Sequence, residues 1–475
     1  MESMPAHRYL VVSDLHLADV EEHADGWMAH KSARYLFDGS FADLLRDFVS
    51  RSEDGAQLTL VLNGDIVDFD LVTAVPDAPP WPVRRSERKR GLDATAPKSK
   101  WKLEQVLSHH PVFVQALTDF LVAGHRVVYL LGNHDRELHF PEVRAVLVCA
   151  LEACAARAGK ALPPGRLSFE PWFFYVPGEL YVEHGQQYDH YTSFRYPLWP
   201  VLPGGGEPKL ALPMGNLTNR YLMSRMGYFN PHASDYILNV FTYVAHWLRF
   251  YAFSKRALFT TWLFGSLAVV WQMLETRQLL RPVPTQHEEQ LAFVARQNRL
   301  SLQEVRVLAG MQHLPITSRL FRMLRELWVD RLAIAVFMTV GTLALAFSPA
   351  PLWTKLMVPL STFPLIYFVY EMLAEGETIF TIEKEFPRRA RLVAQLLPAK
   401  VVTFGHTHKP RQIPLDHGTT FVDTGTWAPV MDPKNRTDLL PGLRNYLELT
   451  FVGGAVDLDL RSWMFEPPKL PLGSP

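Results

Sequence analysis

Five short clusters in the sequence contain residues that can bind metal ions or transfer protons. Each follows an apolar run of strand length: Asp14-Leu15-His16, Gly64-Asp65-Ile66-Val67-Asp68, Gly132-Asn133-His134-Asp135, His184-Gly185 and Gly405-His406-Thr407-His408. Carboxylates, an amide oxygen and imidazoles, with no thiolate, suit Mn²⁺, Fe or Zn²⁺, and two ions more easily than one. A single cluster of this kind is usually structural. If all five were structural, many unpaired polar groups would have to gather by chance at strand ends, where burial penalises them. The residue types therefore predict a two-metal site.

The apolar runs before these clusters predict the strands that position them. Strands are expected at 8–13, 58–62, 126–131, 399–404, 421–427, 446–451 and 456–460, with a hairpin turning at Pro177-Gly178 before His184. Helical patterns at 41–50 and 111–123 lie between the first strands, and this alternation is typical of an α/β sheet. Because ligands bind beyond the carboxyl ends of strands in open α/β sheets, all five clusters are expected to converge on one edge.

The strand pattern is interrupted in the middle of the chain. Residues 1–190 and 380–465 are expected to form one α/β core in two pieces, 191–379 a helical insertion, and 466–475 a tail. Helix-length apolar or aromatic runs in the insertion lie at 236–253, 257–275, 332–348 and 354–373. Residues 71–100, which are rich in proline and include the basic run RRSERKR at 84–90, are expected to form a long loop. The basic run is expected to be a solvated flap or, as the alternative, to attract anionic headgroups or a diphosphate.

The overall charge gives no sign of a nucleic-acid partner. Lys+Arg and Asp+Glu both number 48, so the formal net charge is zero. The N-terminal sequence has no basic segment followed by a long apolar stretch, so no secretory signal is expected. The expected compartment for the core is therefore the cytoplasm.

The order of the motifs, DxH, GDxxD, GNHD, a lone His and GHxH, resembles that of the calcineurin-like metallophosphoesterases. The resemblance covers both core pieces and implies a four-layer α/β/β/α sandwich. It also implies that one metal is held by Asp14, His16, Asp65 and His408, and the second by Asp65, Asn133, His184 and His406. His134 would then be a proton donor whose ring Asp135 orients, and Asp68 would support a ligand without binding metal.

Three stretches, SDLHLAD, LNGDIVDF and VEHGQQYD, resemble a bacterial branch that contains the UDP-2,3-diacylglucosamine hydrolases of lipid A synthesis. Those enzymes cleave a pyrophosphate whose substrate is half nucleotide and half lipid, but the better-known ones carry Arg where this chain has His134. The alternative enzyme is a phosphatase or phosphodiesterase acting on another nucleotide or on a phospholipid. A third possibility, from another class, is an inactive membrane-associated metal-binding scaffold.

The insertion predicts a membrane hairpin. The run 332–348 has no charge, 354–373 has charges only near its ends, and each approaches the roughly 20 residues that span a bilayer. His406 and His408 must lie on the same side as Asp14, so the number of crossings is even. Crossing at 257–275 and 332–348 would place nine arginines on the far side, against the preference for basic loops inside. The expectation is therefore a hairpin of 332–348 with 354–373 at the cytoplasmic face of the inner membrane. Residues 257–275 would then lie in the interface or re-enter the membrane. The alternative is a soluble helical cap or a dimer interface.

Overall fold

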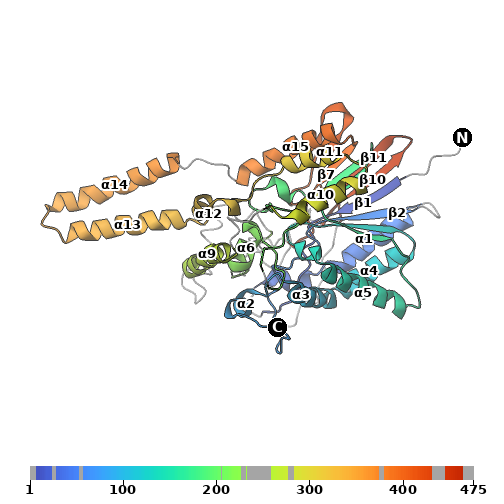
Figure 1. Cartoon of the computed structure of the whole chain (residues 1–475), viewed down its shortest axis with the longest axis horizontal. Helices are drawn as coiled ribbons and strands as arrows, with labels where there is room; N and C mark the ends of the chain where they lie inside the picture. The colour runs from blue at the N-terminus through green and yellow to red at the C-terminus, as the bar shows by residue number, and fades with distance from the viewer. Residues whose placement is uncertain are drawn as a thin grey trace, which may run out of the picture.

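Two β-sheets form the centre of the computed structural model, which describes residues 7–23, 28–52, 57–204, 206–225, 232, 258–276, 283–373, 379–429 and 444–463 (Figure 1). One sheet has the order β11-β10-β1-β2-β3-β4 and the other β5-β6-β7-β9-β8. The strands are β1 (His7–Val12), β2 (Leu58–Asn63), β3 (Arg126–Leu130), β4 (Leu167–Glu170), β5 (Phe173–Val176), β6 (Leu180–Glu183), β7 (Val401–Phe404), β8 (Arg411–Pro414), β9 (Thr420–Asp423), β10 (Asn445–Val452) and β11 (Ala455–Ser462).

The helices lie outside the two sheets. They are α1 (Asp38–Ser50), α2 (Arg85–Arg90), α3 (Ala96–His109), α4 (Pro111–Val122), α5 (Pro141–Arg157), α6 (Met214–Tyr221), α9 (Leu258–Glu275), α10 (Thr285–Gln297), α11 (Leu302–Gly310), α12 (Leu320–Glu326), α13 (Val329–Ala346), α14 (Leu352–Leu373) and α15 (Ile379–Leu396). The predicted helix at 236–253 lies outside the described residues.

The strand sequences are apolar on both faces because each sheet is covered twice. In β1, Leu10 and Val12 join the core under α1 and α4, whereas Tyr9 and Val11 face the other sheet together with Val422. Such continuous apolar runs are typical of strands buried on both sides. Helices α10, α11 and α15 cover the outer face of the five-stranded sheet. This mixed α/β arrangement is consistent with the predicted four-layer sandwich.

Both core pieces contribute to both sheets. Strand β10 pairs antiparallel with β1, so that His7 lies opposite Phe451. Strand β7 pairs parallel with β6 in the second sheet, with Leu180 opposite Val401. The long insertion therefore leaves and re-enters the core without dividing it.

The insertion contains a helical hairpin that projects from the body (Figure 1). Only 6% of the apolar stretch of 18 residues in α13, and none of that in α14, is buried in the protein. The two helices are joined at their base, where Arg331 Nε lies 2.7 Å from Glu371 Oε1 and the Tyr367 hydroxyl donates to the Arg331 carbonyl at 2.9 Å.

The expected long loop at 71–100 was wrong over part of its length, because 85–90 form α2 and α3 begins at Ala96. Glu87 is the physical reason for the first helix. Its buried carboxylate accepts from the Arg84 and Asp93 amides at 2.8 and 2.9 Å and pairs with Lys98 Nζ at 2.6 Å. The charged residues 85–90 therefore form a helix because the side chain of Glu87 points into the protein.

Candidate metal centre

The five clusters meet where the two sheets come together. Asp14, Asp65 and Asn133 follow β1, β2 and β3 of one sheet. In the other sheet, His184 follows β6, and His406 and His408 follow β7. Backbone bonds connect the loops, since the Asp14 amide donates to the Gly64 carbonyl at 3.1 Å and the Gly405 amide to the His184 carbonyl at 2.9 Å. The edge predicted from the strand ends is thus a junction between two sheets.

The backbone is strained at most of the predicted ligands. Five have a left-handed φ: Asp14 (54°), His16 (51°), Asp65 (53°), His406 (70°) and His408 (61°). For a residue with a Cβ this conformation costs about 1–3 kcal/mol and persists only where the surroundings enforce it. Such strain concentrates at functional sites, and here it aims five polar side chains into one space.

Asp14, His16 and His408 form a first group of possible ligands. His408 Nε2 lies 3.1 Å from Asp14 Oδ1 and 3.2 Å from His16 Nε2, and His16 Nε2 lies 3.8 Å from Asp14 Oδ1. Ligand atoms that each bind one ion at about 2.1 Å lie roughly 3 Å apart, so this group has the spacing of a shared ion.

Asp65, His184 and His406 form a second group. His184 Nδ1 donates to the Asn63 carbonyl at 2.8 Å, which leaves Nε2 as an acceptor 3.0 Å from Asp65 Oδ2. Asp65 Oδ1 accepts from the His134 amide at 2.8 Å, so Oδ2 is the oxygen turned toward His184. The groups adjoin each other, because His184 Nε2 is also 4.0 Å from Asp14 Oδ1.

Several buried atoms at this junction fit a metal ion. Among the described residues, Asp14 Oδ1, Asn133 Oδ1 and His184 Nε2 are buried and have no hydrogen-bond partner. Such groups are costly unless something outside the protein satisfies them. Six of the seven predicted ligands thus lie in the two groups, Asn133 lies in the loop whose next amide binds Asp65, and the oxygen and nitrogen donors match the chemistry of divalent transition metals.

The pKa values of the buried residues also indicate a site for cations. Burial lowers the pKa of His184, but Asp65 and Asp14 outweigh burial and raise it to about 10. Burial likewise raises the pKa of Asp14, but His184 and His408 hold it at about 2. The carboxylates therefore attract protons onto the imidazoles, and a divalent cation can take the place of those protons.

Glycines make room for two of the ligands. A Cβ on Gly132 would lie 2.1 Å from Asp65 Oδ1, and a Cβ on Gly64 would lie 2.6 Å from the His184 ring. Neither distance is possible for a real side chain. The glycines of the GD and GN motifs are therefore required by close approach between the loops.

The structure corrects the expected role of Asp135. Its carboxylate accepts from the amides of Ile66 and Gly132 at 2.9 and 2.7 Å and from the Tyr129 hydroxyl at 3.0 Å. The His134 ring faces Asp68 instead, with Nδ1 3.1 Å from Oδ1. Asp135 stabilises the loops, and Asp68 is the residue in position to orient His134.

Asp68 also contacts two further imidazoles. Its Oδ2 lies 3.4 Å from His16 Nδ1 and 2.7 Å from His232 Nε2. Burial opposes the protonation of His134, but Asp68 and Asp65 outweigh it and hold the pKa of that ring well above its usual value. The expectation that Asp68 supports a metal ligand agrees with its contact to His16.

Sequence reasoning missed the residues that the first part of the insertion brings to the site. The His232 ring stacks on that of His16, with centroids 3.5 Å apart, and its carbonyl accepts from His408 Nδ1 at 3.0 Å. Asn216 Nδ2 donates to the Asn133 carbonyl at 2.9 Å. Asp189, at the end of the first core piece and not in the insertion, was missed as well, and its Oδ2 lies 3.1 Å from His406 Nε2. It stands within the stretch VEHGQQYD, so of these three residues only Asp189 had a signal in the sequence.

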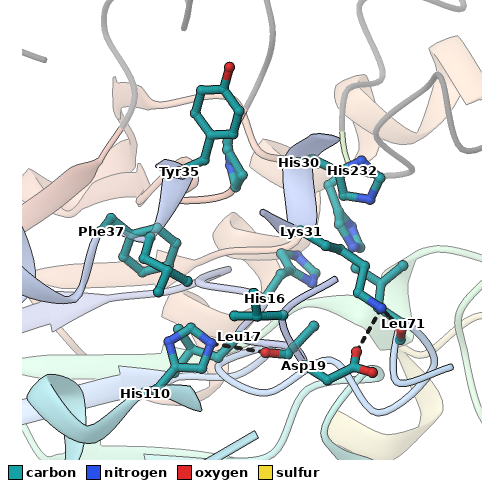
Figure 2. Close-up of a pocket in the computed structure, with 14 residues that line it drawn as sticks. His16, Leu17, Asp19, His30, Lys31, Tyr35, Phe37, Leu71, His110 and His232 are labelled. Atoms are coloured by element: carbon teal, nitrogen blue, oxygen red, sulfur yellow. Dashed lines mark hydrogen bonds and ion pairs between the residues drawn. The ribbon is translucent and has the colours of Figure 1, made fainter. Parts of the chain in front are cut away.

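A pocket adjoins the first group (Figure 2). His16, His30, Lys31 and His232 line one side and Tyr35 and Phe37 the other. Lys31 Nζ is paired with Asp19 Oδ1 at 2.6 Å. The pocket therefore offers both polar and aromatic surface beside the predicted metal ligands.

Comparison with known families agrees with this geometry. The family model for calcineurin-like phosphoesterases matches residues 7–249, just over half of the chain. The matched range contains Asp14, Asp65 and His184, whereas His406 and His408 lie beyond it and reach the site through β7. No curated protein matches the chain.

Proposed function

The chain belongs to the calcineurin-like phosphoesterase family, and from this premise we propose that it hydrolyses a phosphodiester or pyrophosphate bond at a centre for two divalent metal ions. The observation that carries the proposal is the adjacency of the two ligand groups, which meet where His184 Nε2 lies between Asp65 and Asp14. Bound metals would supply Lewis acidity toward phosphate oxygens and toward a water nucleophile. Mn²⁺ is the proposed metal, with Fe or Zn²⁺ as alternatives.

The positions of the residues assign them to different roles in the proposed reaction. Asp14, His16 and His408 would hold one ion, and His184, His406 and Asn133 the other, with Asp65 shared between them. His134 would donate a proton to the leaving oxygen, since its ring borders the first group (5.0 Å from the His16 ring) and is itself turned by Asp68.

The test of the centre is Asp65→Asn in the full chain. The variant is expected to lose at least one metal equivalent by elemental analysis and to lose hydrolysis of a generic phosphodiester. Asp119→Asn, at an exposed position of α4, is the matched control and should retain both. A folded Asp65→Asn protein with full activity would contradict the two-metal proposal, and a metal-loaded but inactive parent protein would favour the scaffold.

For the substrate we propose a lipid-linked pyrophosphate, similar to that of the UDP-2,3-diacylglucosamine hydrolases. The stretches around Asp14, Asp65 and His184 support this, as does the exposed apolar hairpin, which suits an enzyme whose substrate lies in a membrane. His134 favours the second candidate, a phosphatase or phosphodiesterase on another nucleotide or a phospholipid, because the hydrolases carry Arg there. Turnover of UDP-sugar lipids compared with simple nucleotides and phospholipids separates the two.

We further propose that α13 and α14 anchor the protein at the cytoplasmic face of the inner membrane. They are the two helices among the described residues that are long and apolar enough to cross a bilayer. A soluble cap would bury such surface in protein, whereas here almost none of it is buried.

A further inference from the structure

Helix α9 has two apolar faces, and within the described part of the chain only one of them is covered by protein. Ser266, Val269 and Met273 are fully buried on the inner face. On the outer face Phe264, Leu267, Trp271 and Leu274 follow one another at helical spacing, and their exposed fractions are 61, 49, 69 and 50%. These four residues are called the outer stripe. Exposed apolar area of this kind marks a contact surface.

Basic helix α2 lies beside the outer stripe along its length. Arg84 Nη1 is 2.8 Å from Glu275 Oε1 at one end of α9, and Arg90 Nη2 donates to the Phe264 carbonyl at 3.4 Å further back. Between these contacts Arg85, Arg88 and Lys89 are exposed, because the buried Glu87 fixes the opposite side of α2. Glu275 is the one acidic residue in α9.

Helix α9 also contacts the base of the hairpin. Trp262 Nε1 donates to the Leu327 carbonyl at 3.0 Å, and α13 begins two residues later. Trp328, between them, is 63% exposed. Figure 1 shows α9 at the same end of the body from which the hairpin projects.

From these contacts we infer that the outer stripe and α2 form a second membrane contact, in which α9 lies in the plane of an anionic phospholipid bilayer. The apolar side chains enter the headgroup boundary, and Arg85, Arg88 and Lys89 meet anionic headgroups, a combination typical of interfacial helices. The charge beside the stripe argues for this occupant over a second copy of the chain. The contact would hold the body, with its metal centre, against the membrane surface.

The experiment uses full-length protein in vesicles with an environment-sensitive fluorophore on a single cysteine. Cys149 and Cys154 are first changed to Ser, and the label is placed at Trp271→Cys or, as the matched control, at Glu152→Cys on the exposed face of α5. In vesicles containing phosphatidylglycerol, brominated acyl chains should quench the label at 271 and leave the label at 152 unchanged. Combined Arg85→Glu, Arg88→Glu and Lys89→Glu should at least halve this quenching, whereas Arg157→Glu with Lys160→Glu should not.

Two outcomes would overturn the inference. One is a label at 271 that stays in a water-like environment in anionic vesicles. The other is a label that is shielded but not quenched by brominated lipid, which would make the stripe a protein interface. Flotation with the vesicles reports on the hairpin separately, and hydrolysis of a soluble phosphodiester reports on the proposed function, so each failure is distinguishable.

Discussion

His134 Nδ1 lies 3.1 Å from Asp68 Oδ1, although the two residues are 66 positions apart and Asp135 is the neighbour of His134 in sequence. Asp68 is held in turn by its own loop, since the same oxygen accepts from the Asp70 and Leu71 amides at 2.9 and 3.0 Å. The carboxylate therefore fixes the ring in one orientation. This pair leads to the first prediction.

His134→Ala is expected to keep both metals and to lower kcat by roughly 10²–10⁴-fold, because it removes a proton donor and leaves the metal ligands in place. Asp68→Asn should lower kcat in the parent protein but much less in the His134→Ala background, since residues that act as a unit are not additive. Steady-state kinetics measures kcat for each variant, and elemental analysis measures its metal content.

Asp135→Asn is the matched control for that cycle. It disturbs the hydrogen bonds to Ile66 and Tyr129, so its effect should be a loss of stability that is the same in both backgrounds. Equal effects of Asp68→Asn in both backgrounds, or loss of metal from His134→Ala, would contradict the assigned roles.

The second prediction concerns Gly132. Gly132→Ala places a methyl group 2.1 Å from Asp65 Oδ1, so Asp65 must shift from its place beside His184. Metal content and activity should both fall, by at least about 10-fold in activity, because small displacements at a reacting centre cost that much or more. Gly39→Ala in α1, where nothing lies within 4 Å of the added Cβ, is the control and should change neither. Normal metal content in Gly132→Ala would show that the loops can separate freely.

The positions of the ligands could be predicted from the sequence because strand ends are local features. Asp14, Asp65 and Asn133 each follow an apolar run, and parallel strands bring such ends to one edge. The orientation of the side chains could not be predicted, because it depends on the left-handed backbone at positions such as His16 and on packing between loops far apart in the chain. This is why Asp135, adjacent in sequence, was assigned the contact that Asp68 makes.

The insertion was predictable only in its apolar segments. Helices α13 and α14 begin and end close to the predicted runs, because a long apolar run without charges can be recognised from the sequence alone. His232 has no periodic or motif signal, so its contact with His16 and Asp68 emerges only in the folded chain. Helix α2 was missed because the inward-facing Glu87 is hidden in a run of surface charges.

The third prediction concerns pH and His139, whose ring makes an edge contact with Trp199 at a centroid distance of 5.2 Å. Burial, together with Arg136 and Arg144, lowers the pKa of this ring to about 3. The unfolded chain takes up the proton near pH 6.5 and the folded chain does not. The contribution of the neutral ring to stability is therefore complete above about pH 6.5 and is lost as the pH falls toward 3, by up to about 1.4 kcal/mol per pH unit.

His139→Asn should flatten this dependence, so that the free energy of unfolding falls less steeply between pH 7 and pH 5 than in the parent. Urea denaturation of the detergent-solubilised full chain at three pH values measures the slope. His417→Asn, at an exposed position, should leave the parent slope unchanged. An identical slope in His139→Asn would contradict a ring that stays neutral in the folded chain.

The last prediction concerns the hairpin. Helices of 18 and 22 residues are roughly 27 and 33 Å long, close to the roughly 30 Å of the hydrocarbon core. The Arg331–Glu371 ion pair lies at the base of the hairpin, so neither charge needs to enter the bilayer. Pro359 and Pro364 within α14 are compatible with a membrane helix, where prolines are tolerated. If the hairpin spans the membrane, the turn at Ala350 emerges on the side opposite the metal centre.

A cysteine at Ala350, in a chain with Cys149 and Cys154 changed to Ser, should react with an external impermeant maleimide in sealed right-side-out vesicles and should not react in sealed inverted vesicles. The matched control is a second chain that keeps Cys149, which is exposed on α5, and has Cys154 changed to Ser and Ala350 unchanged. Its Cys149 should react in inverted vesicles and not in right-side-out ones. Labelling of both positions from the same side would contradict a crossing. Recovery of the protein in the soluble fraction at high salt without detergent would do so as well, and the metal centre would be unaffected, because its ligands come from the sheets.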